Sequence, residues 1–215
     1  MTQLADYYRD RAAEYDAVYA KPERQDDLGR LRGLLARLAQ GRVLEVAAGT
    51  GYWTRVLSAS ASAAEVTATD VNPETLDVAR ARRYGPAPVT FRVADAYALG
   101  EVPGEFDMAF IGFFWSHVLR AALPRFLDGL HARLGQGAPV TVVDNRYVPG
   151  SSTPISRTTP EGDTFQRRTL HDGRGYEIVK NFPERGQFTA DVAAVGADVE
   201  WTQLRYFWLA TFRLR

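Results

Sequence analysis

The chain contains no cysteine among its 215 residues. This absence excludes disulfides, thiolate metal sites and cysteine nucleophiles, and it is compatible with a cytoplasmic protein. Histidine is also scarce, with three residues at positions 117, 131 and 171. Their spacing is not typical of metal ligands, so we expect no metal site.

A net charge is lacking as well, because 26 basic residues balance 26 acidic ones. No overall positive field attracts nucleic acid, so we expect no nucleic-acid partner. Apolar runs fall short of the roughly 20 residues that span a bilayer, and the first residues lack the layout of a signal peptide. We therefore expect no membrane partner. For the oligomeric state, we expect a monomer or a homodimer.

The middle of the chain alternates short apolar strands with amphipathic helices. Strands are expected at 42–47, 65–69, 89–93, 106–111 and 140–143. Helices are expected between them at 52–60, 73–84 and 123–134. This alternation is typical of a parallel sheet that helices cover on both faces.

The pattern changes after residue 144. A polar stretch at 145–163 precedes a candidate hairpin of strands at 164–170 and 176–180, and a helix is expected at 184–195. Two final β-rich runs, 199–204 and 206–212, lie too close together for a parallel crossover and should pair antiparallel. We predict one α/β domain with a seven-stranded, mostly parallel, doubly wound sheet and a C-terminal antiparallel hairpin.

Two helices are expected before this core, at 4–19 and 26–39. In the first, Tyr8, Tyr15 and Tyr19 share one face. We divide the single domain into four segments: N-terminal helices at 1–40, a core at 41–143, an insertion at 144–182, and a final helix with strands at 183–215.

The strongest motif is the glycine-containing turn that follows the first strand, with the sequence Glu45-Val46-Ala47-Ala48-Gly49-Thr50-Gly51. Glycine lets the backbone approach a ligand closely, and the start of the next helix offers free N–H groups. A carboxylate at position 45 would repel the pyrophosphate of a dinucleotide and suits a ligand with a positive group. Thr54 also departs from the dinucleotide fingerprint, which has glycine or alanine at that position.

Two further acids follow the next two strands. Asp70 comes nineteen residues after Gly51, and spacing near 20 places an acid on ribose hydroxyls. Asp95 follows the third strand, where it can accept from an adenine amine. Phe113 and Trp115 add aromatic surface after the fourth strand, and all four positions lie where open α/β sheets bind ligands.

Through these motifs the chain resembles the class I, Rossmann-like S-adenosylmethionine-dependent methyltransferases of the small-molecule type. The turn resembles the family's first motif, with Ala47 in place of the usual first glycine, Asp70 resembles its ribose acid, and Asp95 its adenine-contacting acid. The resemblance implies S-adenosyl-L-methionine as cofactor and S-adenosyl-L-homocysteine as product. It also implies methyl transfer to an oxygen, nitrogen or carbon of a small molecule. Cofactor contacts are predicted for Glu45, Ala47, Gly49, Gly51, Trp53, Asp70, Val71, Asp95, Ala96, Phe113 and Tyr19.

The acceptor side is expected from the N-terminal helices, which cover the cofactor in related methyltransferases, and from the insertion. His117 is the candidate general base. Arg11 is a candidate for the cofactor carboxylate, and either of two insertion arginines could bind an acceptor carboxylate or phosphate. The predicted substrate contacts are Tyr7, Tyr8, Trp115, Arg146 and Arg157.

Three alternatives remain open at this point. A nicotinamide-dependent oxidoreductase would share the fold, and Tyr176 and Lys180 have the spacing of its Tyr-x-x-x-Lys pair. However, these two residues lie in a predicted strand, along which their side chains diverge. The others are an enzyme that uses S-adenosylmethionine without methylating and a cofactor-binding protein without catalysis.

Overall fold

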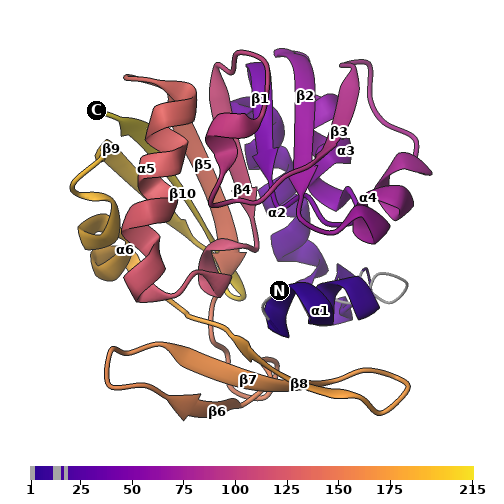
Figure 1. Ribbon diagram of the computed structural model, residues 1–215, viewed down its shortest axis with the longest axis vertical. Coiled ribbons are helices and arrows are strands. Elements are labelled where there is room, and N and C mark those ends of the chain that lie inside the picture. The colour runs from indigo at the N-terminus through magenta and orange to yellow at the C-terminus, as the bar shows by residue number, and fades with distance from the viewer. Residues whose placement is uncertain (1–2, 12–15, 17–18) are drawn as a thin grey trace.

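The computed structural model describes residues 3–11, 16 and 19–215. Its centre is a seven-stranded sheet in the order β3-β2-β1-β4-β5-β10-β9 (Figure 1). Five strands run parallel: β1 (Gly41–Val46), β2 (Ala63–Asp70), β3 (Val89–Val93), β4 (Met108–Gly112) and β5 (Pro139–Asn145). The last two, β9 (Gly196–Gln203) and β10 (Phe207–Leu214), form an antiparallel hairpin, and β10 also pairs antiparallel with β5. The predicted fold class is confirmed.

Helices cover both faces of this sheet: α2 (Gln25–Leu38), α3 (Tyr52–Ser58), α4 (Pro73–Arg80), α5 (Leu123–Leu134) and α6 (Arg185–Val192). The side chains of β1 alternate between two cores, with Val43 packed beside α2 and α3 and Leu44 packed beside α5 and α6. Burial on both faces explains why the central strands are apolar runs without polar alternation.

The helix that we expected at 4–19 is shorter in the structure. α1 (Gln3–Asp10) ends at Asp10, whose carboxylate accepts a hydrogen bond from the Tyr176 hydroxyl at 2.6 Å and pairs with Arg174. Residues 12–15 and 17–18, and with them Tyr15, lie outside the described residues. Tyr19 does not continue the stripe of Tyr8, because its ring stacks on Tyr52 at 3.7 Å.

A second, three-stranded antiparallel sheet lies below the main one in Figure 1. It contains β6 (Ile155–Thr158), β7 (Thr164–Thr169) and β8 (Gly175–Val179). The last two form the predicted hairpin. β6 lies within the polar stretch 145–163, where no strand was predicted, and its four side chains are all exposed. α1 lies between the two sheets and packs on β8 through Tyr7, Leu170 and Ile178.

The two N-terminal helices have different roles in the structure. α1 borders the carboxyl edge of the main sheet, as a covering helix should. α2, by contrast, belongs to the core, because its side chains Leu28, Leu31 and Leu35 are fully buried.

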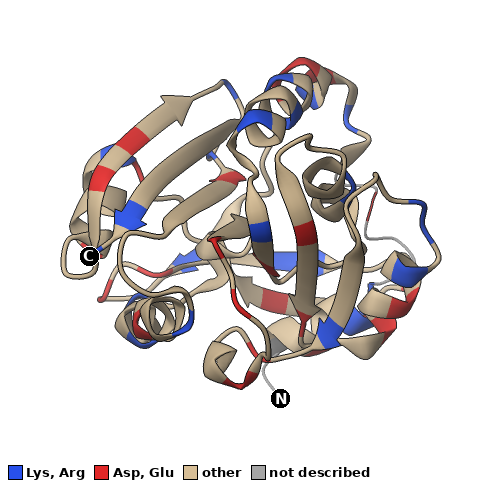
Figure 2. Ribbon diagram, turned by 90° about the horizontal axis from the view of Figure 1, so that it is seen from above, with Lys and Arg blue, Asp and Glu red and all other residues tan. Residues whose placement is uncertain are grey.

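Short 3-10 turns complete the connections: η2 (Pro22–Arg24), η3 (Leu99–Glu101), η4 (Trp115–His117) and η5 (Arg120–Ala122). Seen from above, acidic and basic positions are mixed over helices and strands (Figure 2). Among the helices described here, none is long and apolar enough to cross a membrane.

Candidate functional site

The carboxyl ends of β1 to β4 border a cavity of about 310 Å³, which we call the edge cavity. Leu4, Ala5 and Tyr8 close it on the side of α1. Six of the predicted cofactor contacts line it: Ala47, Asp70, Val71, Asp95, Ala96 and Phe113.

Asp70, at the end of β2, is held by the backbone of two neighbouring loops. The Gly49 N–H donates to its Oδ2 and the Asn72 N–H to its Oδ1, both at 2.9 Å. Burial raises the pKa of this carboxyl above its ordinary value. Because each oxygen can accept more than one bond, the carboxylate still has acceptor capacity toward the edge cavity. It is suited to bind a pair of vicinal hydroxyls.

Glu45, at the end of β1, lies beneath the turn and does not line the edge cavity. Its side chain is 1% exposed, and the Thr54 hydroxyl donates to Oε2 at 2.6 Å. Burial raises the pKa of Glu45 to about 8, and the nearby charge of Asp70 adds to this effect. Within the described part of the chain, the hydrogen bonds to these two buried carboxyls come from neutral donors: the Thr54 hydroxyl and backbone N–H groups. This donor and acceptor set fits a ligand that brings hydroxyls and positive charge, as S-adenosyl-L-methionine does.

A Glu45→Gln substitution should change how the stability of the free protein depends on pH. Above its ordinary pKa of 4.5 the unfolded carboxyl is ionised, whereas the folded one stays protonated up to about pH 8. The wild-type free energy of unfolding should therefore fall as the pH rises through this window, by on the order of 1–3 kcal/mol. The glutamine variant should lack this loss. Denaturant unfolding at pH 5.5 and pH 8 measures the difference, and equal pH dependence in both proteins would contradict it.

The glycines of the turn act through their backbone. Gly49 provides the N–H that holds Asp70, and Gly51 has φ +80°, where an added Cβ would lie 2.3 Å from the Tyr84 hydroxyl. Ala47 stands at the position of the family's first glycine and still adopts φ +56°. A side chain in this left-handed region costs about 1–2 kcal/mol. The turn is kept in a conformation that glycine would adopt more easily.

Trp53 and Tyr19, also predicted to contact the cofactor, do not line the edge cavity. Trp53 is buried between Phe110 and Phe113, because its helix α3 turns this face toward the sheet. Tyr19 packs on Tyr52 and lines a second cavity instead.

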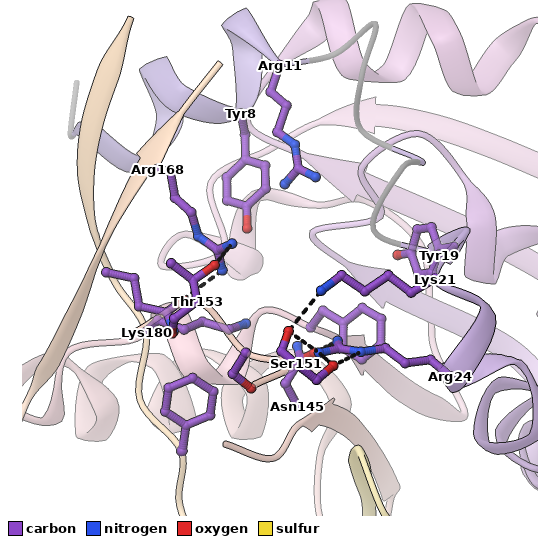
Figure 3. A pocket seen from close by; sticks show the side chains of 14 residues that line it. Tyr8, Arg11, Tyr19, Lys21, Arg24, Asn145, Ser151, Thr153, Arg168 and Lys180 are labelled. Atoms are coloured by element: carbon purple, nitrogen blue, oxygen red, sulfur yellow. Dashed lines mark hydrogen bonds between the residues drawn. The ribbon is translucent and has the colours of Figure 1, made fainter. Parts of the chain in front are cut away.

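The second cavity, of about 270 Å³, is bordered by five cationic side chains, and we call it the basic cavity. The lining residues that the structure describes include no Asp or Glu. Figure 3 shows the side chains extending from several parts of the chain toward one space near the Tyr8 hydroxyl. Tyr8 and Phe113 line both cavities, so the two adjoin there. The five cations are Arg11, Lys21, Arg24, Arg168 and Lys180.

Neighbouring polar groups fix several of these cations in place. Arg168 donates to Thr153 Oγ1 at 2.6 Å and to Gln166 Oε1 at 2.7 Å, and its buried Nε has no partner within the described part of the chain. Lys21 and Arg24 both donate to the Ser151 carbonyl, at 2.8 and 3.1 Å. The cavity is thus lined by donors that are already oriented.

His117, the candidate general base, lines the edge cavity and uses both ring nitrogens. Its Nδ1 lies 2.7 Å from the Val179 carbonyl, which can only accept, so Nδ1 carries the proton. Nε2 is then an acceptor and receives the Tyr8 hydroxyl at 2.7 Å. Burial lowers the pKa of His117 well below its ordinary value and raises that of Tyr8, so both stay neutral. In this arrangement His117 holds Tyr8 and has no nitrogen left to receive a proton.

The other predicted substrate residues line neither cavity. Tyr7 packs against Leu170 and Ile178, because α1 turns this side chain toward the small sheet. Trp115 is buried in the core, where its ring lies 4.7 Å from that of Phe188.

The two insertion arginines are also placed elsewhere. Arg146 donates to the Leu204 and Arg205 carbonyls and so ties the end of β5 to the β9–β10 turn. Arg157 pairs with Glu177 at 2.9 Å across the small sheet. Of the expected residues, the basic cavity contains Tyr8, Tyr19, Arg11 and Phe113.

Sequence reasoning missed four of the five cations. The alternation along β7 could have shown that Gln166 and Arg168 share a face, away from Arg167. Lys180 drew attention only through its spacing from Tyr176. Lys21 and Arg24 showed no pattern, because their approach to the insertion depends on the tertiary fold.

Comparison with known proteins supports the methyltransferase prediction. Residues 43–137 match a family model described as a methyltransferase domain. No curated protein matches the sequence. A solved complex of DhpI with SAH is 32% identical, with 99% of this chain and 95% of that chain covered and a TM-score of 0.76. A DhpI complex with SAM and HEP is 31% identical, with 98% and 96% covered and a TM-score of 0.78.

A more distant structure, CalS10 from Micromonospora echinaspora, an amino pentose methyltransferase with bound SAM, is 18% identical, with 93% and 94% covered and a TM-score of 0.58. It shares the fold. Together with the motifs and the edge cavity, the closer matches show that the chain belongs to the class I S-adenosylmethionine-dependent methyltransferases. The enzyme transfers a methyl group from S-adenosyl-L-methionine, and the predicted cofactor and reaction are confirmed.

Proposed function

We propose that this methyltransferase acts on a small molecule that carries an oxyanion, such as a carboxylate or a phosphate, and binds it in the basic cavity. The observation that carries the proposal is the set of five cations around one cavity, which adjoins the edge cavity at Tyr8 and Phe113. Arginine forks and lysine ammonium groups are the side chains that bind such anions most strongly.

Electrostatics supports an anionic occupant. Burial lowers the pKa of Lys21, Arg24 and Lys180 below their ordinary values, so their charged forms are destabilised in the absence of a ligand. An anion between these side chains would offset that cost, whereas a neutral acceptor would leave it in place. The cavity should therefore discriminate by charge.

We assign the edge cavity to the cofactor, with Asp70 on the ribose and Asp95 near the adenine. Glu45 would act from below the turn, toward the positively charged end of the ligand. When bound, S-adenosyl-L-methionine supplies an activated methyl group on a sulfonium. The protein's part is to align the acceptor with that methyl group and to exclude water. Holding the two reactants together in the correct orientation lowers the barrier to their reaction.

The cellular location, the partners and the oligomeric state of the protein are also part of the proposal. Balanced charge and the absence of cysteine support action in the cytoplasm on a small molecule, without a nucleic-acid partner. We expect a monomer or homodimer and retain the division into four segments at 1–40, 41–143, 144–182 and 183–215.

An acceptor panel tests the proposed function. Carboxylates, phosphate monoesters, phosphonates and HEP, the compound in one DhpI complex, are each paired with a neutral amide or alcohol of the same carbon skeleton. Formation of S-adenosyl-L-homocysteine should be about 100-fold faster, as kcat/KM, with the anionic member of an accepted pair. Faster turnover of the neutral members would contradict the proposal.

A further inference from the structure

Two of the described side chains, Tyr8 and Phe113, line both the edge cavity and the basic cavity. They therefore stand where a methyl donor in one cavity meets an acceptor in the other, and we call this place the junction. Both side chains are aromatic and uncharged. The basic cavity next to them has five cations, and its described lining residues include no Asp or Glu. A positive sulfur at the junction would therefore be repelled from one side unless a neighbouring group stabilises it.

The Tyr8 hydroxyl has a defined direction, which His117 sets. The His117 Nδ1 carries the proton, because it lies 2.7 Å from the Val179 carbonyl, so Nε2 accepts the Tyr8 hydroxyl at 2.7 Å. Lys180 lies farther from Nε2, at 3.5 Å, and donates instead to Ser116 Oγ at 2.6 Å. A phenol oxygen keeps acceptor capacity after it has donated its proton. Toward a ligand at the junction, the Tyr8 oxygen therefore offers lone pairs and no proton.

Burial keeps this arrangement in one state. His117 is 5% exposed, and its ring centroid lies 5.3 Å from that of Tyr8 in an edge arrangement. Burial lowers the pKa of His117 well below its ordinary value and raises the pKa of Tyr8, so both side chains are neutral near pH 7. The O–H dipole therefore stays oriented toward His117. A dipole that is oriented in advance stabilises charge without any cost of reorganisation.

We propose that Tyr8, positioned by His117, distinguishes the charge on the sulfur of the cofactor: its oxygen contacts the positive sulfonium of S-adenosyl-L-methionine, which therefore binds more tightly than neutral S-adenosyl-L-homocysteine. The inference rests on the proposed function, since it places the donor in the edge cavity and an anionic acceptor in the basic cavity. A carboxylate at the junction would also stabilise a sulfonium, but it would repel an oxyanion. A neutral tyrosine avoids this conflict. Transfer of the methyl group to the acceptor leaves the S–C electron pair on sulfur, so the product lacks the charge that Tyr8 stabilises.

A Tyr8→Phe variant tests the proposal, because it removes the oxygen and keeps the ring. In calorimetric titrations, its Kd for S-adenosyl-L-methionine should be about 10-fold above that of the wild type, while its Kd for S-adenosyl-L-homocysteine stays within about twofold. Sinefungin, in which an amine-bearing carbon supplies positive charge in place of the sulfonium, should lose affinity as the methyl donor does. Equal losses for the donor and the product would overturn the inference.

Tyr7→Phe is the matched control, since it removes a hydroxyl from the neighbouring tyrosine of α1. The Tyr7 ring packs against the small sheet, and the residue lines neither cavity. Its hydroxyl accepts from Arg11 at 3.0 Å. This variant should keep the wild-type ratio of the two Kd values. If the ratio changed as much as in Tyr8→Phe, the packing of α1 would distinguish the ligands, and the role of the Tyr8 oxygen would be refuted.

Two substitutions of His117 test its role as the positioning residue. His117→Gln keeps an acceptor for the Tyr8 proton and should retain most of the difference between the two Kd values. His117→Leu lacks an acceptor, so the Tyr8 hydroxyl can rotate, and the preference for the methyl donor should fall about fivefold. The Kd for S-adenosyl-L-homocysteine should change less than twofold in both. A wild-type preference in the leucine variant would refute the positioning role.

The wild-type protein separates a failure of this inference from a failure of the proposed function. If it binds the methyl donor no more tightly than S-adenosyl-L-homocysteine, yet binds inorganic phosphate and prefers anionic acceptors, the inference alone fails. If it does not bind inorganic phosphate and kcat/KM does not depend on the charge of the acceptor, the proposed function fails. A tighter Kd for the donor, lost in Tyr8→Phe and kept in Tyr7→Phe, supports the inference.

Discussion

Asp70→Ala should bind S-adenosyl-L-homocysteine at least about 100-fold more weakly than the wild type, because hydrogen bonds to charged groups each contribute about 1.5–3 kcal/mol. Two such bonds to the ribose are expected at this carboxylate. The alanine also removes the acceptor for the Gly49 and Asn72 N–H groups, so the loop that borders the edge cavity loses its anchor. Both effects weaken binding of the cofactor to the free enzyme, before any acceptor binds.

Calorimetric titration with S-adenosyl-L-homocysteine measures this loss, with NAD as the ligand that neither protein should bind. Asp107→Ala is the matched control. Asp107 stands just before β4, at the opposite edge of the sheet, and pairs with Arg42 at 2.9 Å. This variant should keep the wild-type Kd. An Asp70 variant with wild-type affinity would mean that the cofactor binds elsewhere.

Arg168→Gln should raise the KM for the oxyanion acceptor about 100-fold and leave the affinity for S-adenosyl-L-homocysteine within about twofold. The variant removes a guanidinium that Thr153 and Gln166 orient and whose Nε has no partner among the residues described. Arg168→Lys should recover part of the affinity, since it keeps the charge but not the planar fork.

The chain offers a close control for this experiment in the neighbouring residue. Arg167 lies on the same strand, faces the other side, and is 84% exposed near Glu177. Arg167→Gln removes the same charge from the sequence and should leave KM and inorganic phosphate binding unchanged. Equal losses in both variants would show that overall charge, and not the basic cavity, attracts the acceptor.

The sequence was most informative about the main sheet and the edge cavity. Strands buried on both faces are apolar runs, and the family motifs place Asp70 and Asp95 at strand ends that must meet at one edge. The strands depend on local sequence, and the meeting of the two acids depends on the strand order, for which an alternating strand–helix chain has few possibilities. The prediction of the central sheet therefore followed from short stretches of chain.

The basic cavity depends on contacts that local patterns do not contain. Arg24 reaches Ser151 across more than a hundred residues, and Lys180 reaches Ser116 from the position just after β8. The predicted arginines 146 and 157 had the right chemistry, but the small sheet turned one outward and the β9–β10 turn engaged the other. Residue type could be predicted there, whereas position could not.

α1 provides walls for both cavities: Leu4 and Ala5 face the edge cavity, Arg11 just after the helix faces the basic cavity, and Tyr8 faces both. A ligand that fixes α1 in place therefore prepares the site of the other ligand. The two binding equilibria share one free energy of coupling, and thermodynamic linkage makes it reciprocal. By whatever factor the acceptor tightens the binding of the methyl donor, the donor tightens the binding of the acceptor.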